Sequence, residues 1–353
     1  LSEIQVENLI ITHNTNLIDS VDINIDQMIV KEDGLSIMNL ELNQDNSILH
    51  ATCQIDRQEI NIKVHDSQLN HMDPLFELYD LKIPLRNDTI NFQSSISIRQ
   101  DSVNCNFEIM SGNSALHMDL VKTMDLISAD YKSNLDLKDL SMISSEYYDL
   151  DNVNIEGKID FYEIDSILYQ GIVESNYGLI EFYINTSQDK YSQFSFDVID
   201  FDLGLLFNDK KVGKTNSKLI FDIQHNKLLN VQTFINSLVI NKYNYRNISI
   251  LKNNSFNNST VYDININDPN LNLFAQCNVN NLSNQRKFIY SSNLSGIINR
   301  LDLNNLHYNI NDSIRFISTE FLIEDFSLVI PENQSPFLQQ NNPKIKLKNF
   351  HYN

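Results

Sequence analysis

Apolar and polar residues alternate with a period of two along most of this chain. Segments such as 153–161, 219–223 and 271–279 place an apolar side chain at every second position, mostly with polar residues between. Successive side chains of a β-strand point to opposite faces, so this period gives each strand one apolar and one polar face. About twenty such segments follow one another. We therefore expect an all-β chain that runs as a long antiparallel meander.

Only two stretches have a helical pattern, and both are short. Residues 73–81 begin with Asp73 and Pro74, a capping residue followed by proline at the first helical position. Residues 138–148 place their apolar side chains on one side of a helix. No segment resembles the long crossover helix of a parallel sheet. We expect residues 1–353 to form one continuous elongated segment, with a soft boundary near 138–150.

The apolar faces of so many strands must be hidden from water. A two-layer sandwich or a closed barrel would hide them, but such folds turn corners with Gly and Pro, and the chain has only 8 Gly and 6 Pro. Few Gly also predicts few turns with positive φ. We therefore expect a long sheet curled into an elongated apolar-lined groove (a β-groove or β-taco) that lipid acyl chains would fill. The residues expected to line it are Leu219, Phe221, Ile223, Ile248, Ile250, Ile264, Ile266, Leu271, Leu273, Ile314, Phe316 and Phe321.

The formal charge of −20 is unevenly distributed. Residues 1–200 carry 11 basic and 35 acidic side chains, whereas residues 201–353 carry 15 basic and 11 acidic ones. Such an acidic surface repels nucleic acid, which excludes nucleic-acid binding. The longest apolar runs have only four or five residues, such as residues 326–330. No segment therefore approaches the roughly 20 residues needed to span a bilayer. The chain begins with Leu, and we expect it to be a piece of a longer or processed protein.

The three cysteines, Cys53, Cys105 and Cys277, are far apart and each occupies an apolar position of an alternating segment. We expect free thiols that act as small buried hydrophobic residues, and they do not indicate a redox compartment.

The motifs that suggest chemistry are all incomplete. Residues 213–215 read Gly-Lys-Thr, but a phosphate loop needs Gly five positions earlier and a helix afterwards, whereas an alternating strand follows. Residues 22–26 and 263–268 resemble the start of a calcium loop but lack its Gly. The pairs at 65–66 and 71–73 each combine His with Asp, and no third metal ligand is recognisable. We expect no enzyme, no catalytic residue, no metal and no cofactor.

Three stretches resemble the AsmA-like/TamB family of bacterial envelope proteins, especially its Bacteroidetes-type TamB members. Residues 197–223 contain Asp-Leu-Gly-Leu-Leu between two strands, residues 238–279 contain the hairpin Asp-Pro-Asn, and residues 288–306 end in Leu-Asp-Leu-Asn-Asn-Leu. The resemblance is best over 130–310.

The resemblance implies a segment of a bridge-like lipid transfer protein that conducts phospholipid along a β-groove between the inner and outer membranes. It implies a periplasmic location, an inner-membrane anchor N-terminal to this chain, a TamA-like or BamA-like barrel protein as partner, and a role in outer-membrane assembly. One alternative is a structural or adhesive β-rod that binds protein partners and carries no lipid. A repeat of fixed length would favour this rod, and the sequence shows none. Another is an envelope enzyme whose catalytic residues lie elsewhere in a longer chain.

Overall fold

The computed structural model divides the chain into two compact units, Leu1–Asn176 (unit 1) and Tyr177–Asn353 (unit 2). The structure describes residues 3–13, 21–32, 34–44, 47–70, 89–136, 152–162, 166–187, 190–207, 209–225, 227–256, 259–281, 287–303, 305–306, 316–331 and 337–352.

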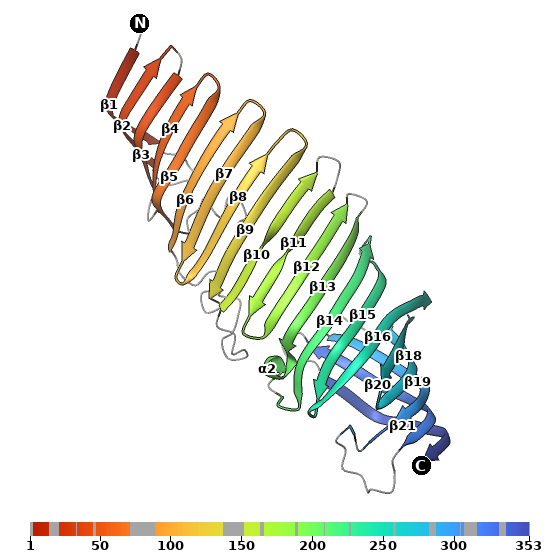
Figure 1. Ribbon diagram of the computed structural model, residues 1–353. Coiled ribbons are helices and arrows are strands. Elements are labelled where there is room, and N and C mark those ends of the chain that lie inside the picture. The colour runs from red at the N-terminus through yellow and green to blue at the C-terminus, as the bar shows by residue number, and fades with distance from the viewer. Residues whose placement is uncertain are drawn as a thin grey trace. The chain divides into compact units, whose positions relative to one another are not determined.

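In unit 1, each strand pairs antiparallel with the next one in the chain, and Figure 1 shows these strands side by side in a single layer. The strands are β1 (Glu3–His13), β2 (Val21–Lys31), β3 (Gly34–Gln44), β4 (Ser47–Asp56), β5 (Glu59–Asn70), β6 (Thr89–Arg99), β7 (Ser102–Ser111), β8 (Ser114–Lys122), β9 (Leu126–Asp136), β10 (Asn152–Tyr162) and β11 (Ser166–Ser175).

Unit 2 continues the same pattern, with each strand paired antiparallel to its successor. Its elements are β12 (Gly178–Ser187), β13 (Tyr191–Asp202), the helix α2 (Leu203–Phe207), β14 (Val212–Gln224), β15 (Lys227–Ile240), β16 (Tyr243–Phe256), β17 (Ser259–Asp268), β18 (Leu271–Asn281), β19 (Lys287–Leu301), β20 (Ile317–Pro331) and β21 (Phe337–Tyr352).

The prediction of an all-β antiparallel meander is confirmed, but in neither unit is the sheet closed or strongly curled. A deep trough would require most strands to bend toward their apolar side, and the irregular positions that permit bending occur in only some of them. The helices predicted at 73–81 and 138–148, and the soft boundary at 138–150, lie outside the described residues. Among the residues that are described, no helix is long and apolar enough to cross a bilayer.

Asparagine and aspartate supply the positive φ angles that we expected to be scarce. Asn39 (φ 50°), Asp66 (φ 32°), Asp200 (φ 48°) and Asn349 (φ 50°) lie inside strands. At each of them the pairing register with one neighbouring strand shifts, which is the mark of a β-bulge. Asn and Asp tolerate this conformation better than other side-chain-bearing residues. The expectation based on Gly concerned turns, whereas these four residues lie inside strands, where Asn and Asp provide the positive φ angles in a chain that contains 50 Asn.

Two strands end in the same five-residue pattern, Asp-Leu-x-x-Leu, which we call the Asp clip. The backbone N–H of Asp202 donates to the carbonyl oxygen of Tyr177 (2.6 Å), and that of Asp302 donates to Asn270 (2.8 Å). Each acceptor lies in the turn of the hairpin next to that strand. Each Asp carboxylate also accepts the backbone N–H three residues later, at 3.0 and 3.1 Å respectively. The clip therefore holds the end of a strand against the neighbouring hairpin. In the clip of Asp302, the backbone N–H of Leu306 donates to the carbonyl oxygen of Asp302 (3.1 Å), and Leu306 is only 1% exposed.

Replacement of Asp302 by Ala should lower the free energy of unfolding by about 1–2 kcal/mol, because a buried side-chain cap is lost. Urea unfolding followed by circular dichroism would measure this change. Asp101→Ala is the matched control, since Asp101 is exposed and forms no hydrogen bond within the described residues. Equal stability of the two variants would contradict a stabilising role for the clip.

Candidate functional site

Cross-strand pairing in unit 2 gathers aliphatic side chains into continuous rows. Directly opposite residues of an antiparallel pair lie on the same face. Ile248 on β16 is opposite Ile266 on β17, which is opposite Leu273 on β18. In the adjacent row, Ile250 is opposite Ile264. The rows extend from β13 to β21, and we call the surface they form the apolar face of unit 2.

Ten of the twelve residues predicted to line a groove share this face. They are Leu219, Phe221, Ile223, Ile248, Ile250, Ile264, Ile266, Leu271, Leu273 and Phe321. Ile314 lies outside the described residues.

Phe316 is the predicted lining residue that the structure places elsewhere. It immediately precedes β20, and its ring centre is 4.7 Å from the guanidinium carbon of Arg300. Arg300 is opposite Asn272, whose neighbours Leu271 and Leu273 belong to the apolar face, so Arg300 lies on the polar side. Phe316 therefore contacts a cation on the polar side and does not extend the apolar face.

The apolar face also contains an aromatic cluster that the sequence analysis missed. Phe194 on β13 stacks on Phe221 of β14 with ring centres 4.5 Å apart and an interplanar angle of 12°. Phe196 lies 6.0 Å from the same ring. The alternation of Phe194 and Phe196 within a predicted strand could have indicated them, but only the register shows that they join the lining residues.

No second layer covers the apolar face of unit 2 in the part of the chain that the structure describes. Strands there contact their neighbours in the sheet, and α2 lies against β14. Ile248 and Ala275 are buried, whereas most of the other lining side chains are half-buried. At the edge strand β21, Ile345 and Leu347 are 63% and 52% exposed. Contiguous apolar surface of this kind marks a site of interaction.

The middle of the face is formed by small residues. Ala275 is opposite Gly296, and Gly296 is opposite Phe321. A Cβ atom added at Gly296 would lie 2.7 Å from the Cα of Ala275 and would overlap the carbonyl oxygen of Phe274. Glycine at this position therefore permits the close approach of β18 and β19.

Gly296→Ala should reduce the free energy of unfolding by about 1–3 kcal/mol, because the added methyl group forces these two strands apart. Thermal or urea unfolding would reveal the change. Ser295→Ala provides the control, since it alters the adjacent residue on the opposite face. If both variants unfold alike, the close approach is not required.

Unit 1 has an apolar face of its own. One row runs through Ile62, Ile96, Cys105 and Leu120 on β5 to β8.

The three cysteines are free, as predicted, but half-buried rather than fully buried. Burial raises the pKa of the thiols of Cys53 and Cys105, which keeps them protonated and poorly reactive.

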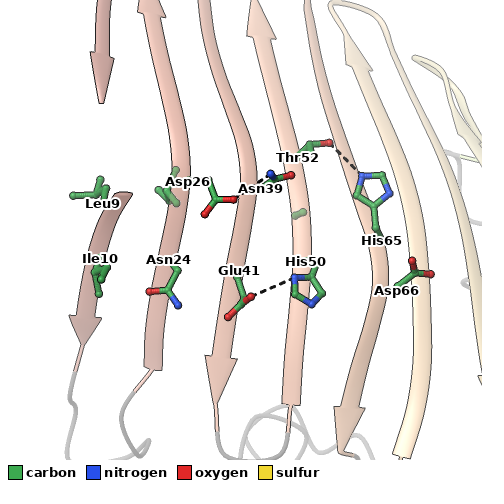
Figure 2. A pocket seen from close by; sticks show the side chains of 12 residues that line it. Leu9, Ile10, Asn24, Asp26, Asn39, Glu41, His50, Thr52, His65 and Asp66 are labelled. Carbon is green, nitrogen blue, oxygen red and sulfur yellow. Dashed lines mark hydrogen bonds and ion pairs between the residues drawn. The ribbon is translucent and has the colours of Figure 1, made fainter. Parts of the chain in front are cut away.

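The polar face of unit 1 is hollowed where β1 to β5 lie side by side, and the open hollow has a volume of about 650 Å³. Figure 2 shows Glu41, His50, Thr52 and His65 along it. The Nδ1 atom of His50 lies 3.7 Å from Oε2 of Glu41, and Nε2 of His65 lies 3.5 Å from the Thr52 hydroxyl oxygen. As these side chains stand, no three His, Cys, Asp or Glu residues of the described chain converge on one metal position.

A second exposed histidine on this face lies next to a carboxylate. Nε2 of His117 is 3.1 Å from Oδ2 of Asp119. The amide of Asn106, which donates to Asp119, and the imidazole of His117 lower the pKa of this carboxyl group.

The other motifs lie in strands. Residues 213–215 are part of β14, so the alternation after them does form a strand and not the helix of a phosphate loop. Residues 22–26 belong to β2 and residues 263–268 to β17. Of the His–Asp pairs, His65 and Asp66 lie in and beside the bulge of β5, whereas 71–73 fall outside the described residues.

No family model matches this chain, and the comparisons with curated proteins and with solved structures found no match either.

Proposed function

We propose that this chain is part of a lipid transfer protein whose apolar sheet faces carry phospholipid acyl chains. The observation that supports this most directly is the apolar face of unit 2. Aliphatic side chains from consecutive strands lie side by side there, and no second layer covers them among the described residues. The face is continuous across strands, which suits a ligand that moves along it.

Binding of an acyl chain to this face requires only apolar contact. Each methylene group removed from water contributes about 0.8 kcal/mol, so an acyl chain lying on this face would be held by many small contributions. None of these contributions depends on the head group. The site would accordingly accept phospholipids with different head groups. Because the contacts are weak and spread over the face, a bound acyl chain would be able to slide along it.

The sequence resemblance to TamB-like proteins supplies the cellular setting of the proposal. In that setting the chain is a segment of a periplasmic bridge, anchored in the inner membrane elsewhere in the full protein, with a TamA-like or BamA-like barrel as its outer-membrane partner. The sheet would act as a shallow open groove, deepened where Asn and Asp bulges bend its strands.

Ile266→Asp should reduce the phospholipid that co-purifies with the chain, because it places a charge in the middle of the apolar face. Native mass spectrometry, with lipid extraction from the same sample, would measure the lipid per chain. Since Ile266 is half-buried, Ile345→Asp at the exposed edge offers a second variant that should fold normally.

Asn265→Asp is the matched control for this experiment. It introduces the same charge one residue away, on the opposite and exposed face of β17. The proposal predicts normal lipid content in this variant. A folded wild-type chain without lipid, or equal lipid content in the Ile266 and Asn265 variants, would overturn it.

A β-rod that binds protein and carries no lipid is the second candidate. It is favoured by the occurrence of two Asp clips, because each clip holds the end of a strand against a neighbouring hairpin and so stiffens the sheet. A lipid-free monomer in the experiment above would favour this function.

A further inference from the structure

The polar face of unit 1 aligns three side chains of the kinds that bind transition metals. Glu41 on β3 is directly opposite His50 on β4, and His50 is opposite His65 on β5. Opposite residues of an antiparallel pair have Cβ atoms about 4.5–5.5 Å apart. In the sequence, His65 is followed by Asp66, and no third ligand is recognisable near them. The pairing register supplies Glu41 and His50 from strands that precede it in the chain.

Two of the three side chains are already close to a metal-binding geometry. Nδ1 of His50 and Oε2 of Glu41 are 3.7 Å apart. Two ligands bound at 2.0–2.1 Å to a tetrahedral zinc ion lie roughly 3.4 Å from each other. The observed separation therefore differs by only a few tenths of an ångström from that of two ligands of one ion.

The third side chain points the other way. Figure 2 shows the ring of His65 turned toward Thr52, where Nε2 makes its 3.5 Å contact with the hydroxyl oxygen. This contact is long and therefore weak. His65 is exposed, and the side chain of His50 is 45% exposed, so their rings are able to turn without disturbing buried groups.

We propose that Glu41, His50 and His65 bind one Zn²⁺ ion once the His65 ring rotates toward His50. Imidazole nitrogen and carboxylate oxygen are common zinc ligands, and water would occupy the fourth tetrahedral position. Asp26 and Asp66 line the same hollow and add negative potential that attracts a cation. The site lies on the polar face, so it needs no lipid and does not depend on the proposed function.

Isothermal titration of Zn²⁺ into the chelator-treated chain tests this proposal. We expect one zinc ion per chain in the wild type. His50→Ala and His65→Ala should each weaken binding by at least roughly tenfold, since even the loss of an indirect partner of a metal ligand has that effect. Co²⁺ as a second probe should give the intense visible absorption of tetrahedral coordination in the wild type and not in these variants.

His117→Ala is the matched control, because it removes an exposed histidine that lies beside a carboxylate on the same face. Its zinc affinity should equal that of the wild type. Far-ultraviolet circular dichroism of the metal-free variants would verify that each is folded. The proposal is overturned if the wild type binds no zinc, if the His50 and His65 variants keep full affinity, or if the His117 variant loses as much as they do.

Discussion

Every feature described above depends on the register of antiparallel pairing. Alternation within one strand makes that strand amphipathic, but it does not say which residue of the next strand will lie beside a given side chain. Pairing fixes this, because opposite residues share a face and stand close enough to touch. The same rule joins Ile248, Ile266 and Leu273 on the apolar face of unit 2 and joins Glu41, His50 and His65 on the polar face of unit 1. The chemistry of each surface is thus a property of rows that cross the sheet.

Asparagine and aspartate give this sheet the local irregularities that glycine provides elsewhere. A strand that passes through a residue with positive φ gains an extra residue, so its alternation changes phase there. Asn247 (φ 54°) is an example. Tyr245 and Ile248, on either side of it, lie on the same face of the sheet although they are three positions apart, not two. Aspartate has a second use in the Asp clip, where one carboxylate caps the chain that leaves the sheet. A composition rich in Asn and Asp is therefore compatible with a chain poor in Gly that still bends and turns.

The sequence was a good guide to the strands and to the apolar residues of unit 2, because period two is a local signal. It misplaced Phe316, although Phe316 and Phe321 are five positions apart and the regular alternation of β20 from Ile317 to Ile323 puts them on opposite faces. It indicated His65 as a possible metal ligand but not His50. These two residues are fifteen positions apart in the sequence and lie side by side only because β4 and β5 form a hairpin. The sequence contains the pattern of the Asp clip twice, 100 positions apart. What the two clips share structurally is a hydrogen bond from Asp to a turn that is distant in the sequence, and the pattern alone does not predict this bond. Local pattern thus predicts elements, whereas bulges and turn lengths determine what those elements bring together.

The remaining question is what covers an apolar face that the described chain leaves open. Stacking two copies of unit 1 would hide its apolar face, but residues 1–176 carry 31 acidic and only 10 basic side chains. Two such units brought together would repel each other, and screening weakens this repulsion only beyond about 8–10 Å at ordinary ionic strength. Acyl chains add no charge to the apolar side when the head group remains in water. They also need no matching shape, which suits a surface whose rows contain side chains as different as Gly296 and Phe321. In unit 1, therefore, charge favours a lipid over a second copy of the protein as the missing layer. In unit 2, whose residues 177–353 carry 15 acidic and 16 basic side chains, the uneven shape of the rows is the property that favours a lipid.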